Sequence, residues 1–103
     1  MSEPYIKDFM HFAEETINKI ADILEAQDKD YKFDIDLISS NILSINGDMG
    51  TYIINTQRAS EEIWLSSPIS GPYHFAYKNG EWVSRTNNKL FDILEQELNM
   101  KII

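Results

Sequence analysis

The chain is 103 residues long, 43% of its residues are hydrophobic, and its formal net charge is −8 at pH 7. This length and composition predict one globular domain spanning residues 1–103. The negative charge argues against nucleic-acid binding, which depends on neutralising phosphates, and favours cations or a basic protein surface. No apolar run reaches the roughly 18 residues that a membrane-spanning helix requires, so no membrane contact is expected.

Cysteine is absent from the sequence. This excludes disulfides, thiolate zinc sites and thiol catalysis, and the protein cannot hold an iron–sulfur cluster through cysteines of its own. The sequence also has no basic leader followed by an apolar core, which is the pattern of a secretory signal. We therefore expect a cytoplasmic protein.

An amphipathic helix is predicted from about Pro4 to Glu25. Side chains that recur at helical spacing form its predicted buried stripe: Tyr5, Phe9, Phe12, Ala13, Thr16, Ile17, Ile20, Ile23 and Leu24. The opposite side of the helix carries polar residues three or four positions apart, which form one exposed row: Asp8, His11, Glu15, Asn18, Asp22 and Glu25.

This polar row contains no lysine, although most solvated helix faces mix charges of both signs. Like charges one turn apart destabilise a helix by about 0.2–0.5 kcal/mol per pair, so the arrangement requires a reason. We interpret the row as a cation-binding surface, with an ordinary solvated helix face as the alternative. His11 is included as a candidate metal ligand because it lies beside Asp8 and Glu15 on this row.

Residues 33–37 alternate between apolar and acidic side chains, which predicts a strand with Asp34 and Asp36 on its outer face. If this strand is the sheet edge beside the helix, the two aspartates extend the acidic row. Charged side chains also protect an edge strand against unwanted pairing, so a purely structural role is the alternative. A further strand over residues 42–46 and a turn at residues 46–48 follow.

Two strands, residues 50–57 and 62–66, form the predicted centre of the sheet. Side chains alternate along a strand, so Ile63 and Leu65 face the core while Trp64 faces outward, with His74 expected nearby. A large aromatic side chain on a polar sheet face indicates a contact site, and covering of neighbouring side chains is the alternative.

Strands are further predicted over residues 73–77 and 81–84, and Thr86, Asn87 or Asn88 is predicted to cap a last helix. The predicted order is one helix, about six short strands and one helix. Two amphipathic helices and an antiparallel sheet with one polar face predict an α+β fold, a two-layer sandwich with both helices on one face of the sheet.

Several motifs resemble, in the same order, the signature of the frataxin family, and the resemblance extends from about Tyr5 to Leu98. They are Gly47-Asp48-x-Gly50-Thr51-Tyr52, Asn55-x-Gln57, and Ile63-Trp64-Leu65-Ser66-Ser67-Pro68-x-Ser70-Gly71-Pro72. The segment Tyr73-His74-Phe75, followed by Gly80-Glu81-Trp82, is similar to the bacterial branch. The resemblance implies the same α+β sandwich and a bacterial cytoplasmic setting.

The resemblance also implies a regulatory, iron-binding accessory protein of iron–sulfur cluster assembly, not an enzyme, whose partners are a cysteine desulfurase and a scaffold protein. It implies binding of ferrous or ferric iron by carboxylates of the first helix and first strand: Glu14, Glu15, Asp22, Glu25, Asp34 and Asp36. Partner contacts are implied for Asn55, Gln57 and Trp64. Carboxylates on an open surface suit hard cations in general, so weak affinity and binding of other divalent cations are expected.

Other function classes remain open: a ferroxidase that stores iron in oligomers, and a generic acidic adaptor for a basic partner. Ferroxidase centres usually gather carboxylates and histidines inside a bundle, whereas the acids here are predicted to point outward. A monomer is expected, with metal-induced oligomers as the alternative. Glu62 replaces a glutamine common in the family and adds a charge to the contact face, which Arg58 is expected to offset.

Overall fold

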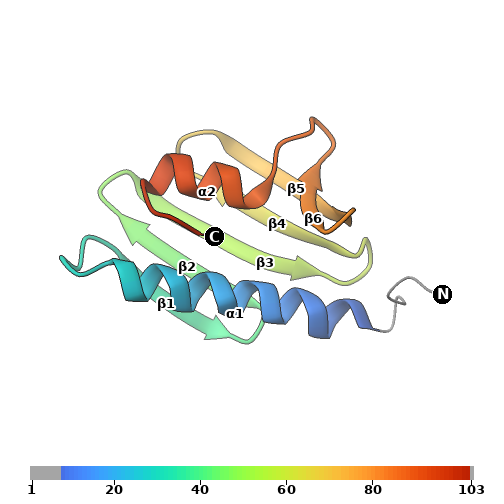
Figure 1. The fold of residues 1–103 in the computed structure, drawn as a ribbon, viewed down its shortest axis with the longest axis horizontal. Helices are drawn as coiled ribbons and strands as arrows, with labels where there is room; N and C mark the ends of the chain where they lie inside the picture. The colour runs from blue at the N-terminus through green and yellow to red at the C-terminus, as the bar shows by residue number, and fades with distance from the viewer. Residues whose placement is uncertain (1–7, 103) are drawn as a thin grey trace.

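The computed structural model describes residues 8–102. Its sheet is antiparallel with six strands in chain order, and both helices cover one face of it (Figure 1). The elements are α1 (Phe9–Gln27), β1 (Asp34–Ser39), β2 (Ile42–Gly47), β3 (Gly50–Gln57), β4 (Glu62–Ser67), β5 (Gly71–Lys78), β6 (Glu81–Ser84) and α2 (Leu90–Leu98). This confirms the predicted two-layer α+β sandwich. The predicted helix start near Pro4 and the predicted burial of Tyr5 lie outside the described residues.

The core lies between the helices and the inner face of the sheet. Residues of α1 at helical spacing are buried: Ala13, Thr16, Ile17, Ile20, Ala21 and Leu24. Leu43, Ile54 and Leu65 lie side by side on β2, β3 and β4 and are at most 1% exposed. Each such apolar side chain contributes about 1.5–3 kcal/mol on burial. No helix within residues 8–102 is long and apolar enough to cross a membrane.

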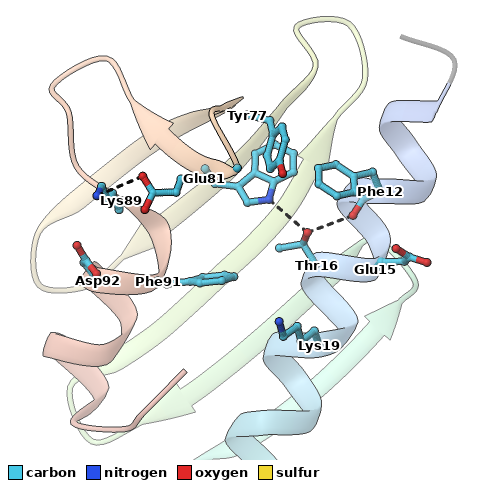
Figure 2. A pocket seen from close by; sticks show the side chains of 11 residues that line it. Phe12, Glu15, Thr16, Lys19, Tyr77, Glu81, Lys89, Phe91 and Asp92 are labelled. Atoms are coloured by element: carbon cyan, nitrogen blue, oxygen red, sulfur yellow. Dashed lines mark hydrogen bonds and ion pairs between the residues drawn. The ribbon is translucent and has the colours of Figure 1, made fainter. Parts of the chain in front are cut away.

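An aromatic cluster joins α1 to the β5–β6 hairpin. The ring centroids of Phe12 and Tyr77 lie 4.5 Å apart, and Phe12 stacks on Trp82 at 5.8 Å. Trp82 donates its indole N–H to the Thr16 hydroxyl at 3.2 Å, and Thr16 donates to the Phe12 carbonyl at 3.1 Å (Figure 2). The buried threonine and indole are therefore both satisfied, which avoids the cost of unpaired polar groups.

Ser67 and Glu97 stabilise the turn between β4 and β5, which contains the Ser67-Pro68-x-Ser70 part of the motif. The Ser67 hydroxyl accepts hydrogen bonds from the backbone N–H groups of Ile69 and Ser70, both at 3.0 Å, and donates to Glu97 at 2.7 Å. Tyr52 also donates its hydroxyl to Glu97, at 3.0 Å. Burial, together with the bond to this carboxylate, raises the pKa of Tyr52 to about 12.

Gly50 is required where β3 begins. Its φ is +127°, a conformation that side chains disfavour, and a Cβ atom there would lie 2.8 Å from Cβ of Pro68. Two motif residues that are distant in sequence, Gly50 and Pro68, therefore meet in the fold.

The prediction that Thr86, Asn87 or Asn88 caps α2 is wrong. Lys89 occupies the N-cap position and makes no side-chain cap bond. Thr86 instead donates to the Asn88 side chain at 2.6 Å, and the Asn88 N–H donates to the Ser84 hydroxyl at 3.0 Å. These side chains are used within the turn after β6 and are not available to the helix.

After α2 the chain turns back between the two helices (Figure 1). The Lys101 N–H donates to the Gln27 side chain at 2.8 Å, and Ile102 is 1% exposed. The tail therefore closes part of the space between the helices.

Candidate functional site

Two surfaces contain the residues that the sequence singles out. The acidic ridge comprises the candidate metal ligands of α1, of its N-cap position Asp8, and of β1: Asp8, His11, Glu14, Glu15, Asp22, Glu25, Asp34 and Asp36. The tryptophan face comprises side chains on the uncovered face of the sheet: Asn55, Gln57, Glu62, Trp64 and His74. The two surfaces differ in how firmly the structure holds their side chains.

On α1 the ridge residues are exposed, except Glu14, which is half-buried. His11 Nε2 lies 3.1 Å from Glu15 Oε2, and both side chains are open to solvent. Asn18, which the helical spacing places on the same row, has a structural role instead. It donates to the Glu14 carbonyl at 2.7 Å and to the Ser40 carbonyl at 3.1 Å, linking α1 to the turn after β1.

The ridge carboxylates have no lysine or arginine partner within residues 8–102. Lys19 lies on α1 one turn after Glu15, yet no ion pair joins the two (Figure 2). The single ion pair within the described part of the ridge is the one between His11 and Glu15. The ridge therefore keeps nearly all of its negative charge available to a ligand.

The ridge continues around the edge of the sheet. β1 is an edge strand, and α1 packs against it, as the sequence pattern requires if the aspartates are to join the ridge (Figure 1). Asp34 pairs with Asn46 and Asp36 pairs with Ser44, and both aspartates are exposed. Ile35, between them, packs inward against the core. The aspartates therefore point to the sheet face away from the helices, around the edge from the acids of α1.

No group of three or more histidine, aspartate and glutamate side chains within residues 8–102 converges to hold a metal ion. The donors on the ridge are exposed carboxylate oxygens and one imidazole. Such a set suits hard cations, iron included, that keep much of their hydration shell. The donor chemistry fits iron, and the described residues offer a charged surface rather than a preformed cage.

The tryptophan face is set by strand register. Asn55 on β3 lies opposite Trp64 on β4, and Trp64 lies opposite His74 on β5. Gln57 lies opposite Glu62. Cross-strand partners share a face, so these five side chains line the uncovered side of the sheet. Trp64 is half-buried, while its chain neighbours Ile63 and Leu65 are buried on the opposite side, as predicted.

The side chain of Glu62 is buried within the tryptophan face and is not an exposed charge. It is 8% exposed and accepts hydrogen bonds from the Trp64 indole N–H and the Ser60 hydroxyl, both at 2.9 Å. Its other carboxylate oxygen lies 3.9 Å from the Arg85 guanidinium. The hydrogen bond from Trp64 is the largest influence that holds the pKa of Glu62 below its usual value.

The expectation that Arg58 offsets the charge of Glu62 is wrong, because Arg85 has that position. Arg85 directly follows Ser84, the last residue of β6, and the pairing of β6 with β5 places Arg85 beside Glu62 on the tryptophan face. No local sequence pattern predicts this contact. The sequence predicts only that His74 lies near Trp64, whereas the structure shows that the two rings stack. The ring centroids lie 4.0 Å apart with an interplanar angle of 8°, which is a parallel stack.

A pocket of about 420 Å³ lies between α1, α2 and the β5–β6 hairpin (Figure 2). Phe12, Tyr77, Trp82 and Phe91 supply its apolar walls, and Lys89 pairs with Glu81 at its margin at 3.2 Å. Of the predicted site residues only Glu15 lines it. It lies on the helical side of the sheet and is separate from the tryptophan face.

An open antiparallel sheet, covered on one face by an acidic helix and carrying a fixed tryptophan on the other, defines a small α+β sandwich protein with two distinct surfaces. A family model described as a Frataxin-like domain matches residues 3–102 of this chain. The chain therefore belongs to the frataxin-like family.

Solved structures of frataxins share this fold. The structure of frataxin from Psychromonas ingrahamii is similar with a TM-score of 0.81 at 19% identity, covering 97% of this chain and 99% of that chain. Yeast frataxin is 35% identical with a TM-score of 0.74, covering 91% of this chain and 80% of that chain. A trimeric frataxin from Saccharomyces cerevisiae, complexed with ferrous iron, is 33% identical with a TM-score of 0.65, covering 96% and 88%.

Proposed function

We propose that this protein is an iron-binding accessory of iron–sulfur cluster assembly in the bacterial cytoplasm. In this proposal it regulates a complex of a cysteine desulfurase and a scaffold protein and is not itself an enzyme. The acidic ridge binds ferrous or ferric iron weakly and docks on a basic partner surface. The tryptophan face, with Asn55, Gln57 and Trp64, supplies the shape-specific contact.

One observation carries the proposal: the ridge carboxylates have no lysine or arginine partner within residues 8–102. A helix that exposes several like charges is destabilised by their repulsion, and a cation or a basic surface relieves it. A similar frataxin from yeast has been solved in complex with ferrous iron, which supports iron as the cation. The lack of cysteine supports assistance to another protein's cluster rather than a cluster of its own.

The ridge acts through charge more than through geometry. Asp22 and Glu25 on α1, and Asp34 and Asp36 on β1, are exposed and attract cations while leaving them partly hydrated. Iron held in this way exchanges easily, as a protein that delivers or senses iron requires. The same charges speed encounter with a basic partner, and this effect weakens as salt rises.

Anaerobic titration with ferrous iron, followed by NMR of uniformly labelled protein, tests the metal part. Paramagnetic broadening should affect amides of α1 and β1 first and leave those around Trp64 sharp. Replacing Asp22, Glu25, Asp34 and Asp36 by their amides should abolish the selective broadening. A control variant that replaces three acids outside the ridge, Glu61, Glu81 and Asp92, by their amides should retain it. Broadening that is uniform, or that centres on the tryptophan face, would contradict the assignment.

Calorimetry with purified cysteine desulfurase, alone and with the scaffold protein, tests the partner part. The variant in which Asp22, Glu25, Asp34 and Asp36 are replaced by their amides should bind the desulfurase more weakly than the wild type does. Its affinity should also depend less on salt concentration. A generic acidic adaptor predicts instead that any basic protein of similar charge competes equally. Equal competition by a basic protein such as lysozyme would refute the specific partner.

Iron storage in oligomers is a second candidate, favoured by the trimeric state of the yeast frataxin complexed with ferrous iron. Sedimentation velocity with and without ferrous iron separates this from the regulatory proposal. The regulator is expected to remain a monomer at stoichiometric iron and to consume no more oxygen than iron in buffer. Metal-induced assembly with rapid oxygen uptake would favour storage with ferroxidase activity.

A further inference from the structure

We propose that Glu62 is a positioning residue of the tryptophan face, whose carboxylate fixes the indole ring of Trp64 flat against the imidazole of His74. The proposal rests on the proposed function, because it assumes that Trp64 contacts a partner. It adds a residue that neither the sequence pattern nor the frataxin resemblance assigns to this task.

The geometry around Trp64 leaves its ring little freedom. One face of the indole is stacked on His74, with centroids 4.0 Å apart and planes 8° from parallel. Its N–H donates to Glu62 at 2.9 Å, which selects one of the two ways in which a flat indole can lie on the imidazole. Two neighbours therefore define the ring: His74 against its face and Glu62 at its polar edge, while Asn55 lies opposite Trp64 on the adjacent strand.

The carboxylate of Glu62 interacts with neighbouring side chains of the protein and is largely shielded from solvent. A carboxylate is costly to bury unless it is hydrogen-bonded and paired, and the side chain of Glu62, taken without its backbone, is only 11% exposed. Its partners are Trp64, Ser60 and, more loosely, Arg85, which is 83% exposed. Both hydrogen bonds end on Oε1 of Glu62, and Oε2 faces the Arg85 guanidinium at 3.9 Å, so each carboxylate oxygen has a polar neighbour.

A fixed indole matters for binding because a rigid aromatic side chain loses little conformational freedom on association. Trp64 is half-buried before any partner arrives, so much of its ordering cost belongs to folding. If Glu62 were apolar, the indole N–H would lose the acceptor that it has in this structure, and the ring could turn over. The face would keep its residues but lose its pre-organisation.

NMR of the Trp64 indole N–H resonance tests the positioning directly. Glu62→Leu should move this resonance, and its exchange with water should accelerate at least tenfold. Glu62→Gln keeps an acceptor oxygen, so exchange should stay within about threefold of the wild type. Glu61→Leu is the matched control, because the neighbouring Glu61 makes no bond to Trp64. The indole N–H of Trp82, bonded to Thr16, is an internal reference and should not respond.

Calorimetry with the purified cysteine desulfurase gives the functional readout. Glu62→Leu should weaken binding at least tenfold, whereas Glu62→Gln and Glu61→Leu should weaken it less than threefold. Unchanged exchange and unchanged affinity in Glu62→Leu would overturn the proposal. If even the wild type does not bind the desulfurase, the proposed function fails, and the indole measurement alone still decides whether Glu62 positions the ring.

If Glu62→Leu does not fold, a second test compares only the wild type and Glu62→Gln. In the wild type the indole resonance should shift as Glu62 is protonated in acid, below the usual glutamate range. The shift should be absent in Glu62→Gln, although His74 and Arg85, the other charged groups that face Glu62, are unchanged. An identical acid response in the two proteins would overturn the proposal.

Discussion

The acidic ridge and the tryptophan face carry their charges in opposite ways. Ridge carboxylates such as Asp22 and Asp36 are exposed, and no side chain within residues 8–102 fixes their positions. On the tryptophan face the single carboxylate, Glu62, is buried and bonded to the ring beside it. The ridge therefore offers a local concentration of negative charge, whereas the face offers a fixed shape.

This difference determines how each surface should tolerate change. A surface that acts through charge accepts any arrangement of acids and responds to salt. A surface that acts through shape responds to the loss of one ring or one hydrogen bond.

Replacing the ring of the shape-specific surface should have the largest effect. Trp64→Ala is expected to weaken desulfurase binding by about 3 kcal/mol, roughly 150-fold, as for an aromatic hot spot. Its thermal stability should fall little, because Ile63 and Leu65, not Trp64, face the core. Calorimetry and thermal unfolding measure the two quantities. A variant that unfolds, yet binds normally in its folded fraction, would make Trp64 a packing residue.

Divalent cations should stabilise the protein through the ridge. At 100 times the dissociation constant, a cation that binds only the folded state adds about 2.7 kcal/mol, and each kcal/mol raises Tm by roughly 4–8 °C. Thermal unfolding in calcium, manganese or ferrous iron, compared with sodium chloride at equal ionic strength, measures the effect. If the matched salt gives the same Tm, the ridge is only a docking surface.

Neutralising charges on the ridge should separate repulsion from binding. Asp22→Asn combined with Glu25→Gln removes the repulsion between these two neighbouring carboxylates on α1 and should raise the metal-free stability by about 0.2–0.5 kcal/mol. The same variant should show a smaller metal-dependent rise in Tm. Glu61→Gln combined with Asp92→Asn changes the net charge equally and should keep the full metal response. A loss of metal response in this control would show that net charge, not the ridge, governs binding.

Acid should affect the tryptophan face by the smallest amount. The pKa of Glu62 is lowered in the folded protein, mainly by the hydrogen bond from Trp64, so Glu62 stabilises the fold above its unfolded pKa. That contribution is lost as pH falls through the lowered folded value. Chemical denaturation between pH 7 and pH 3 should therefore show a smaller loss of stability in Glu62→Gln than in the wild type. A parallel pH profile for the two proteins would contradict this assignment.

The fold, and the face on which most residues of the two surfaces lie, were readable from the sequence because they depend on periodicity. Helical spacing separates Ile17 and Ile20 from Asp22, and strand alternation separates Ile63 and Leu65 from Trp64, wherever the elements later pack. Each alternation selects one face of an element, and burying the apolar faces together leaves few architectures. Helices on one side of an antiparallel sheet, with Trp64 on the other, followed from local pattern alone.

Contacts between distant parts of the chain were decided only by tertiary structure. Periodicity places Glu62 on the outer face but cannot show that its carboxylate turns toward the Trp64 indole, or that Arg85 rather than Arg58 lies beside it. It likewise places Asn18 among the ridge residues, where the fold uses it to link α1 to Ser40. Alternation assigns a side chain to a face, while strand register and turn geometry decide which neighbour it meets there.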